Sequence, residues 1–329
     1  MSDVKMIGSM IDITKDDLLT YFHTTKKLKD WLLKDGYRPT MLSNYVLITL
    51  WEKPSLRTRV SFEAGMSQLG GSFITLKAYP PDGEDILLKE DTRDQARVLS
   101  SMGDVIMARV YNHSTIEILI QYSNVPVING MSNEAHPMQM LTDLYTIQEK
   151  KGKLEGLNLV YFGEGSINTA MDMTVACATV GINFILCCPD YSKHSLLREQ
   201  GFGYAHDKYW EEAQKRAQMI DSQLIVEHDP VKAIKQADVV YTDSWFTDNK
   251  PKEKDREDDI REIFLPYQVN KDLLKNAPEA IVMHCLPAYR DNEIAGDVII
   301  GQQSVIYDQA ENRMHVEKGI LVELLKPFK

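Results

Sequence analysis

Short runs of β-branched and aromatic residues alternate with longer amphipathic segments along most of the chain. Parallel strands need a long connection, usually a helix, to return the chain to the same end of the sheet. The alternation therefore predicts an α/β fold of mainly parallel sheets with helices on both faces. Helices are expected at 94–102 and 137–150. The predicted strands are 46–51, 72–76, 105–110, 126–129, 157–162, 184–188, 224–227, 239–242, 281–284 and 305–307.

The chain length favours two domains. With 329 residues, it exceeds the size at which a single hydrophobic core usually stops growing. The long helical pattern of 137–150 runs into a turn rich in lysine and glycine, and we place the boundary there. The predicted domains are 1–150 and 151–329, and the final helical segment, ENRMHVEKGILVELLKPF, is expected to pack back on the first.

Composition excludes several classes of partner. The net charge of −11 would repel phosphates, so a nucleic-acid partner is not expected. No apolar run approaches the roughly 20 residues that span a bilayer, so a membrane partner is not expected either. The polar, acidic first residues and four cysteines without metal-ligand spacing predict a reducing, cytoplasmic location.

A cluster of donors follows the first predicted strand, in YVLITLWEKPSLRTRVSFE. Ser55, Arg57, Thr58 and Arg59 all lie at the first turn of a predicted helix, where unpaired N–H groups and a partial positive charge attract anions. Arginine adds planar, bidentate donors for phosphate or carboxylate. The alternative is an N-cap serine beside solvated arginines. The missing Gly-x-x-x-x-Gly-Lys pattern argues against a nucleoside triphosphate loop.

Two further segments carry polar side chains, one at the end of a predicted strand and one at the start of a predicted helix. Arg109 ends the third strand, where open α/β sheets bind ligands. In HPMQ, Pro137 fits the first turn of a helix, so His136 and Gln139 can converge on one ligand. A salt-bridge arginine and a structural histidine are the alternatives.

Two other motifs invite functions that the residues do not support. His284 and Cys285 are adjacent on a predicted strand and face opposite sides, so they form a poor base–nucleophile pair. A ligand-contacting thiol is the better interpretation of Cys285. The segment GEGSIN lacks the third glycine of a dinucleotide motif, and we predict no NAD site.

Six motifs in this order resemble the aspartate/ornithine carbamoyltransferase family: SLRTR, MARV, HPMQ, YTDSW, HCLPA and AENRMH. The resemblance runs from about residue 40 to the C-terminus, and EKPSLRTRVSFE and HCLP are closest to the ornithine branch. It implies two α/β domains with an active site between them. It also implies a homotrimer, or a multiple of trimers, in which the neighbouring subunit completes each site.

The resemblance implies a residue set for each ligand. The phosphate of carbamoyl phosphate would be held at the turn that contains Ser55, Leu56 (through its backbone), Arg57 and Thr58. The carbamoyl group would be held by Arg109, His136, Gln139 and Arg313. The acceptor amine would meet Asp243, Cys285 and Leu286. Catalytic roles are expected for Arg109, His136, Thr58 and Cys285, and neither a metal nor an organic cofactor is required.

This chain departs from the ornithine branch in the acceptor region. Thr247-Asp248-Asn249 replaces a Ser-Met-Gly triplet, and Ser166-Ile167 replaces paired asparagines, with Asn168 one place further on. Together with Thr247, Asp248 and Ile167, Asn168 belongs to the expected acceptor site. In the 79–90 loop, other members offer a side chain to a neighbouring subunit; Lys89 aligns only loosely, and Asp85 occupies the usual glutamine position.

The predicted activity is transfer of the carbamoyl group from carbamoyl phosphate to a primary amine of ornithine type, giving a citrulline-like ureido product and phosphate. Fewer carboxylate donors, together with Asp248, could instead favour putrescine or another non-ornithine amine. A catalytically silent binding protein is a further alternative, since the acceptor pocket departs most from the family pattern. A cysteine hydrolase built on Cys285 is the remaining one.

Overall fold

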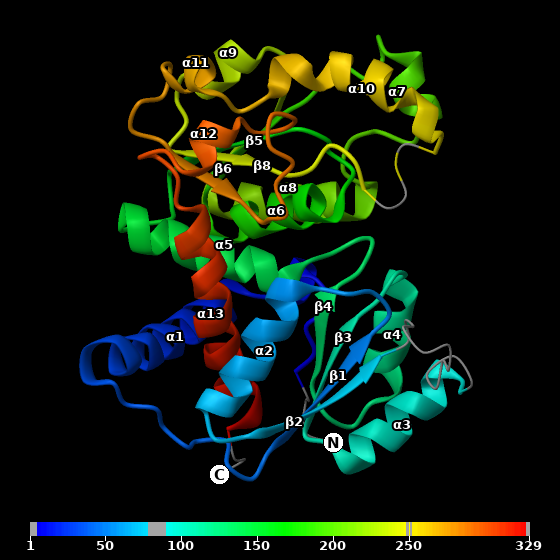
Figure 1. Ribbon diagram of the computed structural model, residues 1–329, viewed down its shortest axis with the longest axis vertical. Coiled ribbons are helices and arrows are strands. Elements are labelled where there is room, and N and C mark those ends of the chain that lie inside the picture. Colours follow the sequence, from blue (N-terminus) through cyan, green and yellow to red (C-terminus); the bar gives the residue numbers. More distant parts are fainter. Residues whose placement is uncertain (1–4, 78–89, 248–249, 251, 327–329) are drawn as a thin grey trace. The chain divides into compact units, whose positions relative to one another are not determined.

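The structure is a computed structural model that describes residues 5–77, 90–247, 250 and 252–326 (Figure 1). The chain divides into two compact units. Unit 1 comprises Met1–Tyr145 with Glu311–Lys329, and unit 2 comprises Thr146–Ala310. The division falls inside two helices, α5 (Pro137–Lys151) and α13 (Ile306–Leu325).

Unit 1 contains a four-stranded parallel sheet with the order β2-β1-β3-β4. Its strands are β1 (Val46–Trp51), β2 (Ser72–Lys77), β3 (Val105–Arg109) and β4 (Val127–Met131). The chain moves from β1 to β2 in one direction and reaches β3 and β4 in the other. The strand order therefore reverses between β1 and β3, and open α/β sheets bind ligands beyond the carboxyl ends of strands at such a point.

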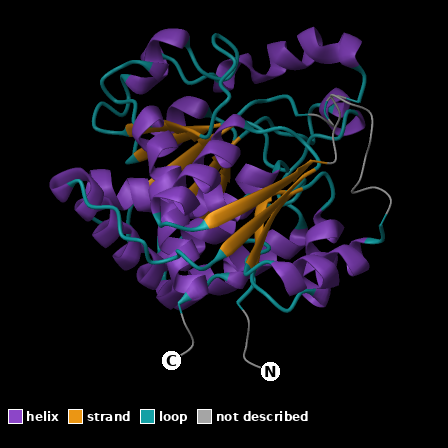
Figure 2. Ribbon diagram, turned by 60° about the horizontal axis from the view of Figure 1, so that its bottom comes forward, coloured by secondary structure: helices purple, strands orange, loops and turns teal. Residues whose placement is uncertain are grey.

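Helices cover both faces of this sheet (Figures 1 and 2). One face carries α3 and α4, whose apolar side chains pack with β1 and β3 around Ile106 and Ala108. The other carries α1, α2 and α13. The helices of this unit are α1 (Lys15–Asp35), α2 (Leu56–Gln68), α3 (Thr92–Met102) and α4 (His113–Tyr122), with a 3-10 turn, η1 (Met10–Asp12), before them.

Unit 2 contains a five-stranded parallel sheet with the order β7-β6-β5-β8-β9. Its strands are β5 (Asn158–Phe162), β6 (Asn183–Cys187), β7 (Leu224–Glu227), β8 (Val239–Thr242) and β9 (Ile281–His284). From β5 the chain proceeds outward to β6 and β7, then returns to β8 on the opposite side. The reversal therefore falls between β5 and β8.

Side chains pack on both faces of the sheet of unit 2. On one face, Phe162 and Val282 pack with residues of α9, α11 and α12. On the other, Tyr161 stacks on Tyr241 at 5.6 Å between ring centroids and contacts Thr169 of α6. The helices are α6 (Asn168–Val180), α7 (Ser195–Glu199), α8 (Asp207–Ile220), α9 (Pro230–Ile234), α10 (Glu257–Phe264), α11 (Lys271–Leu274) and α12 (Gly296–Ile299), with 3-10 turns η3 (Lys254–Arg256) and η4 (Leu265–Tyr267).

The predicted α/β class is confirmed, as is the return of the last helix to unit 1. The strands expected at 46–51, 224–227, 239–242 and 281–284 have the observed bounds, and five others differ at one or both ends by one or two residues. The strand expected at 305–307 is wrong, because α13 begins at Ile306. Val305 N–H donates to the Val282 carbonyl beside β9, but its own carbonyl accepts from Gln309 N–H and so opens the helix.

The described residues contain no helix that is both long and apolar enough to cross a membrane.

The contact between α1 and α13 is close enough to require glycine. A Cβ at Gly319 would lie 3.0 Å from the Tyr21 carbonyl oxygen and 3.0 Å from the Thr25 backbone nitrogen, so backbone would have to move. We expect Gly319→Ala to lower the free energy of unfolding by about 1–3 kcal/mol, because overpacking exceeds the gain in helix propensity.

Chemical denaturation would measure the loss, with Gly65→Ala on α2 as the matched control. The nearest atom to a Cβ at Gly65 is the Lys318 Cγ, at 3.2 Å on a flexible side chain. Its stability is expected to change by no more than about 1 kcal/mol. Equal effects at both positions would show that the α1–α13 contact is not the closer one.

Candidate functional site

The turn between β1 and α2 begins the site in unit 1. Ser55 is the N-cap of α2, and its Oγ accepts a hydrogen bond from Thr58 N–H at 3.3 Å. The capping interpretation of Ser55 is therefore correct, and it leaves other first-turn N–H groups of α2 for a ligand. The sequence order of strand, loop and Ser-x-Arg-Thr produces this turn because the serine ends the extended segment.

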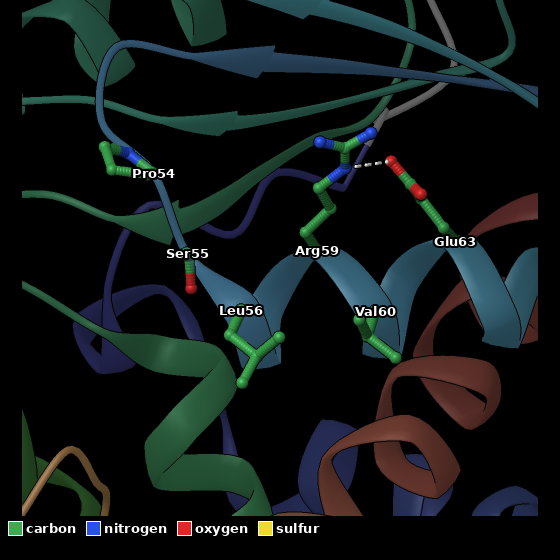
Figure 3. A pocket seen from close by; sticks show the side chains of 6 residues that line it. All are labelled: Pro54, Ser55, Leu56, Arg59, Val60 and Glu63. Atoms are coloured by element: carbon green, nitrogen blue, oxygen red, sulfur yellow. Dashed lines mark hydrogen bonds and ion pairs between the residues drawn. The ribbon is translucent and has the colours of Figure 1, made fainter.

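Arg59 does not join the other donors of the turn. Its Nε donates to Glu63 Oε1 at 2.9 Å along α2 (Figure 3), and the same carboxylate oxygen accepts from Thr75 Oγ1 at 2.9 Å. Arg59 lines a surface depression of about 470 Å³, shared with Leu56 and other residues of the α2 face. Arg59 thus has its own counter-charge.

Arg313 joins three segments that are far apart in the sequence. Its guanidinium donates to Gln139 Oε1 at 2.6 Å and to Thr58 Oγ1 at 3.3 Å. It also donates from Nε and Nη2 to Glu317 Oε1, one helical turn further along α13. Arg313 is only 2% exposed, so these partners replace the water that its charge has lost.

The nitrogen of the Gln139 side-chain amide is held as well. Its Nε2 donates to Asp143 Oδ1 at 2.7 Å. Each polar end of the amide thus has a fixed partner on α5 or α13. The structure therefore brings Thr58, Gln139 and Arg313 together, as the sequence predicts.

His136 lies just before α5 and is buried, with 6% of its surface exposed. Burial, followed by the positive charges of Arg313, Arg109, Arg57 and Lys53, lowers its pKa well below 6.5. The imidazole is therefore neutral at neutral pH and offers one N–H donor and one acceptor. A neutral histidine among several cations can donate to a carbonyl oxygen without adding a charge.

Arg109 and the start of α2 flank the point where the strand order of unit 1 reverses. Arg109 is the last residue of β3 and pairs in register with Trp51, the last residue of β1. The polypeptide leaves these two neighbouring strands in opposite directions. The cations around His136 thus lie near the carboxyl ends of β1 and β3, where ligands bind in such folds.

A second group of polar side chains lies at the reversal in unit 2. Asp243 follows β8, and its Oδ2 accepts from Thr169 Oγ1 at 2.6 Å, while Oδ1 accepts from Ser244 N–H at 2.8 Å. Ile167 is the N-cap of α6 and is 5% exposed, and Asn168 is the first residue of that helix. The apolar N-cap offers no side-chain oxygen to the helix.

Part of the expected acceptor segment follows Asp243. Thr247 and Lys250 exchange two backbone hydrogen bonds of 3.1 Å. The Lys250 ammonium contacts Glu164 Oε2 at 3.3 Å and the Ser166 hydroxyl. Asp248 lies outside the described residues, as do Asp85 and Lys89 of the 79–90 loop.

His284 cannot serve Cys285 as a base. Its Nδ1 accepts from Leu286 N–H at 2.8 Å, which places the ring proton on Nε2, and Nε2 contacts Glu293 Oε1 at 3.0 Å. This arrangement contradicts the cysteine-hydrolase alternative. Ligand atoms of Asp243, His284 and Cys285 lie within 4.8 Å of one another, but both imidazole nitrogens are already used. The donor set therefore does not fit a metal ion.

Several residues around the two sites escaped the sequence analysis. Asp143 and Glu317 lie four residues after Gln139 and Arg313 on their helices, and this i, i+4 spacing was a usable signal. Lys250 contacts Glu164, and Thr169 contacts Asp243, because the segments after β5 and β8 start from neighbouring strands. Nothing in their sequence spacing indicates these contacts.

The chain is similar to known proteins over nearly its whole length. The family model described as "Aspartate/ornithine carbamoyltransferase, carbamoyl-P binding domain" matches residues 5–149, and its "Asp/Orn binding domain" counterpart matches residues 155–324. The ornithine carbamoyltransferase of Thermococcus kodakarensis is 41% identical over 322 residues, which are 97% of this chain and 95% of that protein.

Solved structures agree with this similarity. The ornithine carbamoyltransferase from Pyrococcus furiosus has a TM-score of 0.89 at 40% identity and covers 99% of this chain and 98% of its own. The ornithine transcarbamoylase from Giardia lamblia has a TM-score of 0.84 at 27% identity, with complete coverage of both chains. Since sequence models, relatives and structures all span nearly the full length, this chain belongs to the aspartate/ornithine carbamoyltransferase family.

Proposed function

We propose that this protein transfers the carbamoyl group of carbamoyl phosphate to the side-chain amine of ornithine, giving citrulline and phosphate. The observation that carries the proposal is the convergence of Thr58, Gln139 and Arg313 beside a neutral, buried His136. Relatives that are about 41% identical over 97% of the chain carry the name ornithine carbamoyltransferase, which supports this acceptor.

The phosphate group would bind at the start of α2. Ser55 and Thr58 contribute hydroxyls, the N–H groups of the first turn, including that of Leu56, point toward the ligand, and Arg57 supplies a bidentate cation. These groups stay in place as the phosphate leaves, so they neutralise the charge that develops on it. The proton that the attacking amine loses passes to the leaving phosphate, so the chain need not supply a separate proton donor.

The carbamoyl carbonyl would lie against the remaining donors. When a neutral amine attacks, the carbonyl oxygen becomes negative, and Arg109, His136 and Thr58 would donate to it. One fixed donor of this kind commonly contributes about 3 kcal/mol of transition-state stabilisation. Gln139, which Arg313 holds in place, would accept from the carbamoyl amino group with its amide oxygen and keep the planar ligand in one orientation.

The acceptor would bind in unit 2. Asp243 would accept a hydrogen bond from an amino group of the substrate. The backbone carbonyl groups near Cys285 and Leu286 would accept hydrogen bonds from the N–H groups of the attacking amine. Ile167, Asn168, Thr247 and Asp248 would complete the pocket. In this proposal, residues 1–150 bind carbamoyl phosphate and 151–329 bind the acceptor, with the C-terminal helix returning to the first part.

A homotrimer, or a multiple of trimers, is the proposed assembly. Strand β2 lies at the edge of the described sheet of unit 1, and such edges are usually covered. Phe73 and Ile74 on β2 are 38% and 49% exposed, and Leu56 and Val60 on α2 are 75% and 56% exposed. Exposed apolar side chains gathered in this way mark protein contacts.

The four free cysteines support the proposed location in a reducing compartment, the cytoplasm.

An acceptor panel tests the function. We expect ornithine to give the highest kcat/KM among ornithine, putrescine, lysine, N-acetylornithine and aspartate, measured as phosphate release and ureido product. A preference for putrescine would contradict the ornithine assignment, because Thr247-Asp248-Asn249 would then select an amine without a carboxylate. Tight binding of carbamoyl phosphate without turnover of any amine would identify a silent binding protein.

Arg57→Ala tests the phosphate site. We expect at least a 100-fold loss of affinity for carbamoyl phosphate, by the order of magnitude of two charge-assisted hydrogen bonds lost together. Calorimetry would measure it. Arg59→Ala is the matched control, since Arg59 is paired with Glu63, and its affinity should change by no more than about threefold. Equal losses in both variants would mean that general positive charge, not the Arg57 position, binds the ligand.

Light scattering tests the assembly. The wild-type protein is expected to have three times the mass of the chain, or a multiple of that, and Phe73→Asp is expected to dissociate it because a charge would be buried at the contact. Met219→Asp is the control, because Met219 is 84% exposed on unit 2. A monomeric wild type would contradict the trimer.

A further inference from the structure

The reversal of strand order in unit 2 is bordered by two segments. One is the turn from Gly163 to Ser166 that follows β5, and the other is the segment from Asp243 to Thr247 that follows β8, to which Lys250 is paired through Thr247. Because β5 and β8 are neighbours in the sheet, both segments leave the same edge. Ligands of open α/β sheets bind between such diverging segments.

Lys250 reaches from the second segment into the first. Its backbone is fixed by the paired bonds to Thr247, and its ammonium lies 5.6 Å from the centroid of the Phe202 ring. The side chain is only 16% exposed. The ammonium ends at Ser166 and Glu164, so a flexible side chain is held at one place at the reversal point.

Glu164 has a full set of partners. Its Oε1 accepts from Ser166 N–H at 3.0 Å, from Ser166 Oγ at 2.8 Å and from Gly203 N–H at 2.9 Å. Its Oε2 is the atom that contacts Lys250. The carboxylate is therefore fixed mainly by the turn itself, and Lys250 is held beside it. Among the described residues, two of the three N–H donors of Lys250 have an acceptor.

Besides Glu164, two side chains of opposite charge are thereby fixed near the start of α6. Asp243 is tied to this region through Thr169, and Lys250 is tied to it through Ser166, three residues earlier. The α-amino acid group carries one cation and one anion separated by a single carbon. A carboxylate and an ammonium held on one short stretch of helix start match that pair of charges.

We propose that Lys250 is a specificity-determining residue that binds the carboxylate of the acceptor, with Ser166 and Glu164 holding its ammonium in position. The proposal rests on the proposed carbamoyl transfer. It assigns the acceptor to the α-amino acids and gives this chain a carboxylate donor even though Ile167 offers none. A diamine has no carboxylate, so it would accept no hydrogen bond from the third N–H of Lys250 and would gain no binding energy from this residue.

The experiment compares two acceptors that differ in one group. With saturating carbamoyl phosphate, Lys250→Met is expected to raise KM for ornithine by about tenfold or more, the order of one charge-assisted hydrogen bond, while kcat changes little. KM for carbamoyl phosphate and kcat/KM for putrescine are expected to stay within about threefold of wild type. Lys250→Arg, which keeps the cation, is expected to recover much of the lost preference for ornithine.

Two further variants separate binding from structure. Lys252→Met removes the same charge from an exposed position nearby and is expected to leave both acceptors unchanged. Lys250→Gln keeps a donor for Glu164 and Ser166 but removes the charge. It is expected to raise KM for ornithine by a similar factor, and it replaces Lys250→Met if that variant folds poorly. Equal losses for ornithine and putrescine, or no change for either, would overturn the proposal and leave Lys250 a structural contact.

The outcome stays distinguishable from failure of the proposed function. If the wild type turns over no amine, carbamoyl transfer is contradicted, and calorimetric titration of ornithine into protein saturated with carbamoyl phosphate decides the role of Lys250. Weaker ornithine binding by Lys250→Gln than by wild type would support it. Absence of ornithine binding by wild type, or equal binding by both proteins, would overturn it.

Discussion

The buried guanidinium of Arg313 is the interaction on which the site in unit 1 depends. A charge that is 2% exposed is tolerated only when hydrogen bonds replace its lost hydration. Thr58, Gln139 and Glu317 supply those bonds from α2, α5 and α13. Removing one partner leaves the charge less compensated, so the three helices are constrained together. A ligand that approaches Thr58 or Gln139 therefore meets side chains whose positions are already determined.

The two units place their polar groups by the same topological rule. In each sheet the chain proceeds to one side, returns, and continues on the other, so two adjacent strands send their segments apart. Arg109 and Ser55 flank this point in unit 1, and Asp243 and Glu164 flank it in unit 2. Hydrogen bonding within parallel strands fixes the ends of the neighbours in register, and this fixes the bases of both sites.

The sequence predicted much of this arrangement because strong local signals agree with it. Buried parallel strands are short, apolar runs, and Ser55 and Pro137 mark helix starts by their own chemistry. The failure at 305–307 has a physical reason: Val305 and Ile306 are β-branched because they are buried beside β9, and burial, not pairing, determined the residue type. Lys250 could not be found because its contact with Ser166 joins residues 84 positions apart, and no periodicity in the sequence indicates such a contact.

The charges of the two units fit different kinds of ligand. Around His136, four cations lower its pKa. Cations gathered in this way suit a phosphorylated ligand with a double negative charge. In unit 2, by contrast, the ammonium of Lys250 and the carboxylates of Glu164 and Asp243 place both signs of charge near the start of α6. A zwitterion loses little hydration energy in such a place, since each of its charges exchanges water for a fixed opposite charge.

The same comparison explains why a net charge of −11 does not prevent anion binding. The electric field at a ligand is set by the few groups that face it, and salt screens the rest of the surface.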